Sequence, residues 1–74
     1  MASSTFRATY RDFEITIVGY EIPEGWRMAV ELKRGNRVQV MRDTGRVFRD
    51  FASLRCVGVL TSHIAIMEET TGLE

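Results

Sequence analysis

Apolar and polar side chains alternate with a period of two along much of residues 13–40, and this pattern constrains the fold more than any other feature of the chain. The apolar positions are Phe13, Ile15 and Ile17 in a first segment and Trp26, Met28, Val30 and Leu32 in a second. Successive side chains of a β-strand point to opposite faces of its sheet, so the pattern predicts half-buried antiparallel strands. A chain of 74 residues has room for one such domain and not for two.

Glycine, proline and asparagine mark the predicted turns. Residues 19–25, which include Pro23, are predicted to connect the first strand to a second over residues 26–33. For the next turn we prefer a three-residue loop at 34–36 over a two-residue loop at 35–36, because only the longer loop pairs apolar with apolar side chains. The resulting register pairs Ile17 with Met28, Ile15 with Val30, Phe13 with Leu32, Leu32 with Val38, and Val30 with Val40.

A further turn at Asp43-Thr44-Gly45 is predicted to lead into a short last strand over residues 46–49, with Phe48 beside Val40. The result is a three- to four-stranded antiparallel β-meander. One of its faces collects the apolar side chains of Phe13, Ile15, Ile17, Met28, Val30, Leu32, Val38, Val40 and Phe48. Another element must cover this face.

Residues 51–69 are predicted to form the covering helix, with Asp50 suited to cap its start. At 100° per residue, the stripe expected to face the sheet holds Cys56, Val57, Leu60, Ile64 and Met67, with Ala52 and Ile66 at its edge and Arg55, Ser62 and Glu69 opposite. The alternative is a hairpin over residues 56–67, because Gly58 and several β-branched residues weaken a helix. The predicted class is therefore α+β, with one C-terminal helix packed on one face of the meander.

The ordered domain is predicted to span residues 10–69, with residues 1–9 as a flexible N-terminus and residues 70–74 as a flexible tail. Leu73-Glu74 resembles a cloning remnant. A single cysteine, Cys56, excludes an internal disulfide. The first residues lack the apolar run of a signal peptide, and no apolar stretch approaches the roughly 18 residues of a membrane span. We therefore expect a cytoplasmic protein without membrane attachment.

The residues show no recognisable catalytic set. Cys56 and His63 lie about 10.5 Å apart along a helix, too far to share a zinc ion, so Cys56 is interpreted as a small buried hydrophobe and His63 as a residue at the core edge. Ser62 points away from its neighbour His63, and the chain has neither a phosphate-binding loop nor a nucleophile elbow. We therefore expect no enzyme, no metal site and no cofactor.

Positive charge is concentrated in the middle of a chain whose formal net charge is zero. Residues 27–55 hold eight basic and three acidic residues. The sheet face away from the helix, together with the hairpin tip, is predicted to present a basic set that suits phosphate or nucleic acid: Arg27, Lys33, Arg34, Arg37 and Arg49. Glu31 lies among them and no exposed aromatic accompanies them, so a solvated outer face is the competing interpretation.

The run Tyr10-Arg11-Asp12-Phe13-Glu14-Ile15, followed by Gly25-Trp26, a polar turn and a closing helix, resembles short uncharacterised bacterial β-β-β-α domains. Their architecture is similar to that of HicB-type antitoxins and double-stranded-RNA-binding-like folds. The resemblance covers residues 10–69 and implies a fold rather than a function. This chain shows neither the N-terminal helix of the RNA-binding kind nor the extra C-terminal DNA-binding segment of the antitoxin kind.

Two functions are expected from these residues. The first is a non-catalytic interaction module that binds an unidentified protein partner or associates with itself as a homodimer. Its expected surface is an apolar thread on the outer sheet face, formed by Val18, Ala29, Met41 and Val47. The second is weak nucleic-acid binding by the arginine-bearing hairpin.

Overall fold

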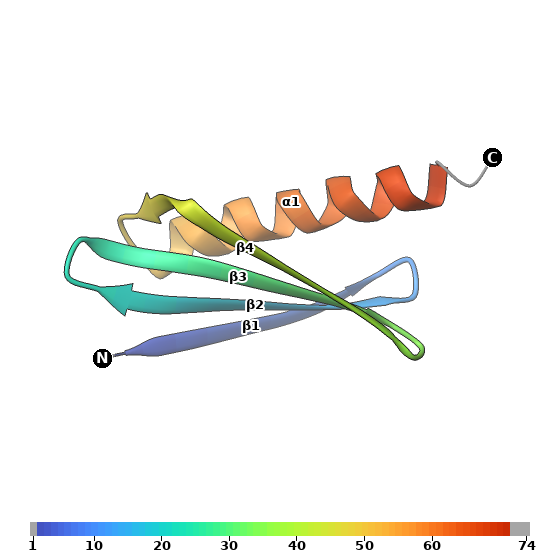
Figure 1. The fold of residues 1–74 in the computed structure, drawn as a ribbon, viewed down its shortest axis with the longest axis horizontal. Coiled ribbons are helices and arrows are strands. Elements are labelled where there is room, and N and C mark those ends of the chain that lie inside the picture. Colours follow the sequence, from blue (N-terminus) through green and yellow to red (C-terminus); the bar gives the residue numbers. More distant parts are fainter. Residues whose placement is uncertain (1, 72–74) are drawn as a thin grey trace.

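The computed structural model describes residues 2–71, without the side chains of residues 43–45, 70 and 71. Four strands, β1 (Ser3–Tyr10), β2 (Phe13–Ile22), β3 (Gly25–Arg34) and β4 (Arg37–Phe48), precede one helix, α1 (Phe51–Thr71). The strands form an antiparallel sheet in the order β1-β2-β3-β4, and α1 runs along one face of this twisted sheet (Figure 1). The predicted α+β meander with a C-terminal helix is therefore confirmed, as is the choice of a helix over a hairpin.

The N-terminal segment corrects the predicted domain boundaries. Residues 1–9 were expected to be flexible, but from Ser3 onward they form β1, which pairs with β2 along its whole length. Arg11 and Asp12, with φ values of 50° and 68°, form the two-residue loop between these strands. Two consecutive positive φ angles define a type I′ turn, whose twist matches that of a hairpin. At the other end, α1 reaches Thr71, so the predicted tail at 70–74 lies largely outside the described residues.

The turn between β3 and β4 has two residues rather than the predicted three. Arg34 pairs directly with Arg37 across a Gly35-Asn36 loop, and Gly35 has a φ of 59°. A single positive φ at a first-position glycine is the signature of a type II′ hairpin turn. Because one residue of register reverses every side chain, Val38 and Val40 lie on the outer face, each with 54% of its surface exposed.

Two further pairings differ from those predicted. The β2–β3 loop contains only residues 23 and 24, so the register shifts by two residues and Ile17 pairs with Val30. A shift of two leaves each side chain on its predicted face. Residues 43–45 do not form a hairpin turn, because β4 stays paired with β3 and accommodates extra residues through a register shift near Trp26. Phe48 therefore pairs with Trp26 and not with Val40.

The core lies between α1 and the two central strands. Its buried hydrophobic residues are Phe13, Ile15, Ile17, Met28, Val30, Leu32, Phe48, Leu54 and Ile66. Trp26, one of the alternating apolar positions, is partly exposed and packs against this core, with its ring 5.9 Å from that of Phe51. A helix about 10 Å wide covers only about two strands spaced 4.8 Å apart, so β1 and β4 are left as partly covered edges.

The helix turns a different face to the sheet from the one predicted. Its fully buried side chains are Leu54, Ser62 and Ile66, and Gly58 lies between them on the same ridge. Gly58 permits this close approach, because a Cβ placed there would lie 3.0 Å from Ile17 and 3.1 Å from the sulfur of Met28. The hydroxyl of Ser62 donates a hydrogen bond to the carbonyl oxygen of Gly58 at 2.7 Å, which satisfies its buried polar atom.

Asp50 caps the start of α1, and this cap gives a prediction about pH. Its Oδ1 accepts a hydrogen bond of 2.8 Å from the backbone N–H of Ser53. This bond, aided by the Ser53 side chain and by Arg49, holds the pKa of Asp50 below its ordinary value of 3.8. A group with a lowered folded-state pKa stabilises the fold above its unfolded pKa and loses that effect as the pH falls through the folded value.

We therefore expect Asp50→Ala to lower the thermal midpoint at neutral pH, because the first turn of α1 loses its cap. The difference from the unmodified chain should shrink as the pH falls below 3.8, where Asp50 becomes protonated. Thermal unfolding followed by circular dichroism from neutral to acidic pH measures this difference. Asp50→Asn keeps a capping side chain and serves as the control. A gap between Asp50→Ala and the unmodified chain that stays constant with pH contradicts this account.

Candidate interaction surface

The solvent-facing side of α1 carries a row of apolar residues, Cys56, Leu60, Ile64 and Met67, which we call the α1 stripe. Cys56 is exposed, and Leu60, Ile64 and Met67 have 61%, 49% and 47% of their surfaces exposed. These four residues were predicted to face the sheet, so that prediction is wrong. At 100° per residue the α1 stripe lies opposite the Leu54–Ile66 ridge that packs on the sheet. The helix is therefore apolar on both its buried and its exposed sides.

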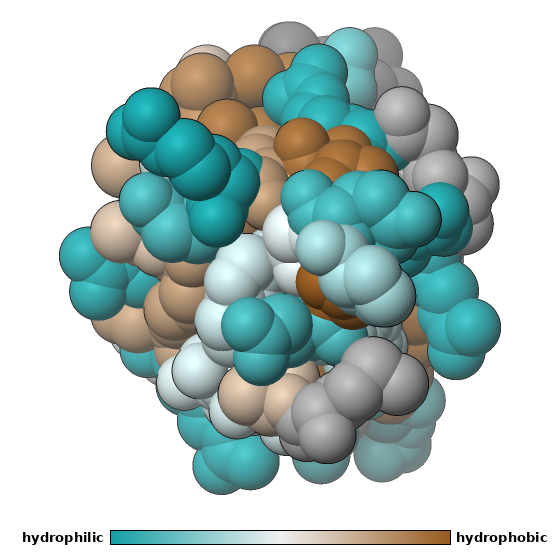
Figure 2. All heavy atoms as spheres, turned by 90° about the vertical axis from the view of Figure 1, so that its left-hand side faces the viewer, coloured by the Kyte–Doolittle hydropathy of each residue, from teal (hydrophilic) through white to brown (hydrophobic). Residues whose placement is uncertain are grey.

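A helix that is apolar all round is typical of an element buried on every side. Here the sheet covers one side only, and the other carries side chains larger than the glycine and serine of the buried ridge. In Figure 2, which views the end where α1 begins, the most hydrophobic colour lies mainly in the upper half of the molecule, the side along which α1 runs in Figure 1. Where exposed apolar residues gather into a patch, the surface is a candidate for binding protein or membrane.

The length and composition of α1 also bear on the membrane prediction. Residues Phe51–Glu69 reach a mean hydropathy of 1.2, so by length and composition alone this helix could cross a membrane. The expectation that no stretch approaches a membrane span is therefore too strong. Core helices of soluble proteins pass the same test, and α1 packs on the sheet through Leu54 and Ile66, which are fully buried.

The five basic residues predicted to form one surface do not come together. Arg27 and Lys33 lie on the outer sheet face, where they pair with Tyr20 and Glu14 of β2. Arg34 and Arg37 sit across the β3–β4 turn on the helix side, and Arg49 follows β4 at the other end of the sheet. Since Arg34 and Trp26 are eight residues apart on one strand, these ends are separated by about 26 Å.

The Arg34–Arg37 pair has its own local partners. The guanidinium of Arg34 lies 5.4 Å from the ring centre of Phe13, and Nη1 of Arg37 lies 3.8 Å from Oε1 of Glu69 near the end of α1. Together with Gln39 these residues border a hollow of about 290 Å³. Arginine beside the last turn of a helix is stabilised by the negative end of the helix dipole. The position of the Arg34–Arg37 pair is therefore explained by its role in stabilising the fold and needs no ligand.

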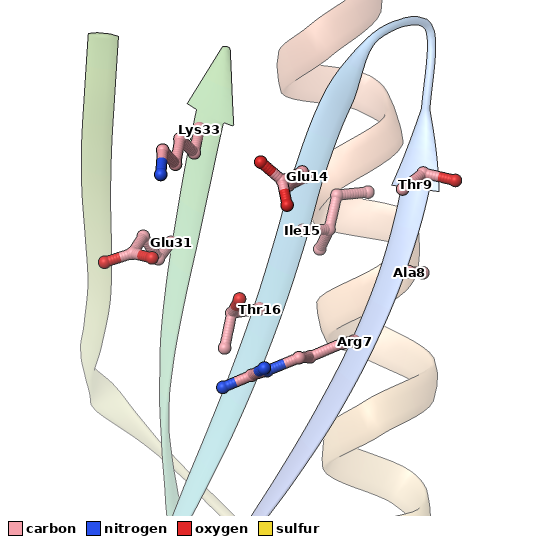
Figure 3. Close-up of a pocket in the computed structure, with 8 residues that line it drawn as sticks. All are labelled: Arg7, Ala8, Thr9, Glu14, Ile15, Thr16, Glu31 and Lys33. Carbon is pink, nitrogen blue, oxygen red and sulfur yellow. The ribbon is translucent and has the colours of Figure 1, made fainter. Parts of the chain in front are cut away.

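The outer sheet face has a larger hollow of about 400 Å³ over β1, β2 and β3. Figure 3 shows Arg7, Glu14, Glu31 and Lys33 around it, with Thr16 between them. Two positive and two negative side chains share this surface, so it presents no single sign of charge to phosphate. The apolar thread predicted on this face is also interrupted, because Met41 pairs with Val30 and packs against the core on the opposite face.

The side chains considered for chemistry lie apart. The ring of His63 stacks on that of Tyr10, with centroids 4.1 Å apart and planes 18° apart, which places it at the core edge as interpreted. Cys56 is exposed rather than buried, which corrects its predicted role as a core hydrophobe. Among the described residues, no three His, Cys, Asp or Glu side chains converge on a possible metal position.

The fold and this surface define a small α+β domain with one exposed apolar helix face. Comparisons of the chain with protein-family models, with curated proteins and with solved structures give no match. The resemblance to HicB-type and double-stranded-RNA-binding-like domains therefore stays a prediction based on the order of strands and helix.

Proposed function

We propose that this protein is a non-catalytic interaction module that associates with a second copy of itself through the α1 stripe. The observation that carries the proposal is the exposure of Leu60, Ile64 and Met67 on a helix whose opposite side is already buried. Burying apolar side chains away from water lowers the free energy. A second copy of the chain carries the same apolar row and can therefore cover it.

The size of the α1 stripe sets the expected strength of association. From Cys56 to Met67 the helix advances about 17 Å, so the stripe and its side chains cover about 300 Å². That is comparable with the largest apolar patch of an ordinary monomer, which is often functional. Two such stripes bury about 600 Å² in total, below the roughly 1,200 Å² of a standard stable interface. We therefore expect a dimer that dissociates on dilution.

Sedimentation velocity across a concentration series, from low micromolar to millimolar protein, tests this proposal. We expect the sedimentation coefficient to rise with concentration from a monomer value to a dimer value. Leu60→Lys should keep the chain monomeric throughout, because it places a charge in the middle of the apolar contact. Its folding stability should change by less than about 0.5 kcal/mol, since position 60 is on the surface.

Val40→Lys is the matched control, because it replaces an exposed apolar residue of the sheet rather than the helix. This variant should associate like the unmodified chain. If the unmodified chain stays monomeric at every concentration, self-association is excluded. If Val40→Lys abolishes the dimer and Leu60→Lys does not, association occurs through the sheet and the proposed surface is wrong.

We do not carry nucleic-acid binding forward as a second function. The five basic residues that motivated it are divided between two sheet faces and two sheet ends, and acidic side chains share the outer face with Arg27 and Lys33. Non-specific affinity for nucleic acid depends on clustered positive charge. The five predicted residues do not form such a cluster.

A further inference from the structure

The strand β1 lies at an edge of the sheet, and its backbone has no strand partner on the side away from β2. The order β1-β2-β3-β4 places no described strand beyond it, and Figures 1 and 3 show it at the margin of the sheet. Along an antiparallel pair, residues alternate between those that bond to the partner strand and those whose N–H and C=O groups point away from it. A row of such unpaired backbone groups is a template on which a further strand can form.

The two-residue loop at 11–12 identifies which residues of β1 point outward. A loop of this kind closes at a hydrogen-bonded pair, so the even-numbered residues of β1 bond to β2. The carbonyl oxygen of Ala2 accepts a hydrogen bond of 2.9 Å from the backbone N–H of Glu21, in agreement with this alternation. The odd-numbered residues therefore direct their N–H and C=O groups to the open edge. They include Thr5, Arg7 and Thr9.

The β1 edge lacks the features that usually protect the edge of a sheet. It pairs with β2 without a register shift, and residues 3–10 hold neither proline nor lysine. The opposite edge, β4, is irregular near Trp26 and carries Arg37, Arg42 and Arg46. The sheet is therefore more open to a further strand at β1 than at β4.

The side chains of β1 define the composition of a strand that fits beside it. On the helix side, Phe6, Ala8 and Tyr10 are half-buried, so an apolar side chain next to them leaves water. On the outer face, Arg7 is the one charged residue of β1, and it makes no ion pair with a described residue. Figure 3 shows its side chain reaching over β2 towards Thr16, and a change of rotamer brings an exposed arginine to an acidic neighbour.

The charge at this edge distinguishes a partner peptide from a second copy. The guanidinium of Arg55 in α1 lies 5.3 Å from the ring centre of Phe6, so positive charge is present on both faces at the level of residues 6 and 7. A second copy brings the same positive side chains to the same edge, and like charges on neighbouring strands are destabilising. A segment with acidic side chains is attracted to this edge.

We propose that β1 accepts an extended segment of a partner protein as a fifth, antiparallel strand of the sheet. The segment alternates apolar residues on the helix side with acidic residues on the outer face. Main-chain hydrogen bonds supply affinity in this mode of recognition, and alternate side chains supply specificity. The β1 edge is separate from the α1 stripe, and the proposal does not rest on self-association.

A fluorescein-labelled peptide of alternating valine and glutamate, about seven residues long, is the probe for an anisotropy titration. It should bind about fivefold more tightly than an alternating valine and lysine peptide of the same length. Arg7→Glu should remove this preference. Arg42→Glu makes the same change at an exposed position of the opposite edge and should leave the preference unchanged. Equal effects of the two substitutions show general charge attraction and overturn the proposed site.

Methylation of the peptide backbone tests whether the peptide binds as a strand. In the antiparallel arrangement the glutamates lie opposite Thr5, Arg7 and Thr9, so their N–H groups point to β1 and those of the valines point to solvent. Methylating the glutamate nitrogens should abolish binding, whereas methylating the valine nitrogens should be tolerated. Thr9→Pro should weaken binding about fivefold, because it removes an outward donor without breaking a bond to β2. If both methylated peptides bind like the parent peptide, strand addition is wrong.

Amide hydrogen exchange followed by NMR locates the peptide and separates this proposal from self-association. The outward amides of β1 should exchange rapidly in the free chain and slowly with the peptide bound. The Leu60→Lys variant should bind the peptide with unchanged affinity, so loss of the dimer leaves this result intact. Protection of the outward amides that rises with protein concentration alone shows that a second copy occupies β1. Peptide-induced changes confined to the α1 stripe show binding at the helix, and either result overturns the proposal.

Discussion

Replacing Gly58 with leucine should remove a large part of the folding stability of this domain. A Cβ at position 58 already lies 3.0 Å from Ile17 and 3.1 Å from the Met28 sulfur, closer than ordinary van der Waals contact. A leucine side chain extends several bonds further, so α1 has to move away from β2 and β3. Overpacking of this kind costs about 3 kcal/mol. At roughly 0.05–0.15 kcal/mol per residue, the whole domain is stable by only about 4–11 kcal/mol, so this loss should lower the denaturant midpoint markedly.

Chemical denaturation followed by tryptophan fluorescence measures this loss, because Trp26 lies 5.9 Å from Phe51 at the start of α1. Gly58→Ala should have a small net effect, since the gain of about 1 kcal/mol in helix propensity opposes the crowding of Ile17. Ala52→Leu adds a leucine to an exposed position of the same helix and is the control for composition. A Gly58→Leu protein that unfolds at the same denaturant concentration as Ala52→Leu shows that position 58 does not face the sheet.

The second large effect is expected from Ile66→Ala, which should lower the free energy of unfolding by about 3 kcal/mol. Ile66 is fully buried among the residues between α1 and the sheet, so its removal leaves a cavity. Ile64→Ala makes the same chemical change two residues earlier, where 49% of the side chain is exposed. It should change the stability of the monomer by less than about 0.5 kcal/mol.

This pair of variants separates the two faces of α1. Both must be measured at low protein concentration, where the monomer predominates, because Ile64 also belongs to the α1 stripe. Equal losses from the two substitutions, or a larger loss from Ile64→Ala, restore the helix face predicted from periodicity. In that case the proposed association surface is buried and its role is withdrawn.

Local alternation predicted most of the sheet correctly because it needs no knowledge of distant partners. The apolar side chains of β2 and β3 face the core as expected, including Ile15, Ile17 and Val30. Alternation misplaced Val38 and Val40 because turn geometry has the stronger influence on register. A two-residue type II′ loop at Gly35 fits the twist of the two strands, and it overrides the apparent benefit of pairing valine with leucine.

The helix face could not be derived from hydrophobic periodicity, for a physical reason. The side that packs on the sheet needs small residues at Gly58 and Ser62, because close approach of the backbone requires them. The larger apolar residues are left for the exposed side. This helix has two apolar sides, and hydrophobic periodicity detects both of them. It does not show which side packs on the sheet of the same chain and which side is left exposed.

The same one-residue error misplaced Arg37 within the predicted basic set. Placing Arg37 opposite Lys33 put it on the outer face, whereas the two-residue loop places Arg34 and Arg37 opposite each other on the helix side. The α1 stripe itself was visible in the sequence as a row of residues, but it was assigned to the interior.

Each strand of the meander is joined to the next by only two residues, at 11–12, 23–24 and 35–36, so every strand pair is local in sequence. Hairpins closed by such short loops form within microseconds, and low contact order favours rapid folding. The apolar face of the sheet is thus built entirely from residues 3–48, and α1, which covers it, follows in the sequence. A sheet that forms before α1 docks exposes Ile15, Ile17 and Val30 to solvent, and transiently exposed apolar surface of this kind favours aggregation.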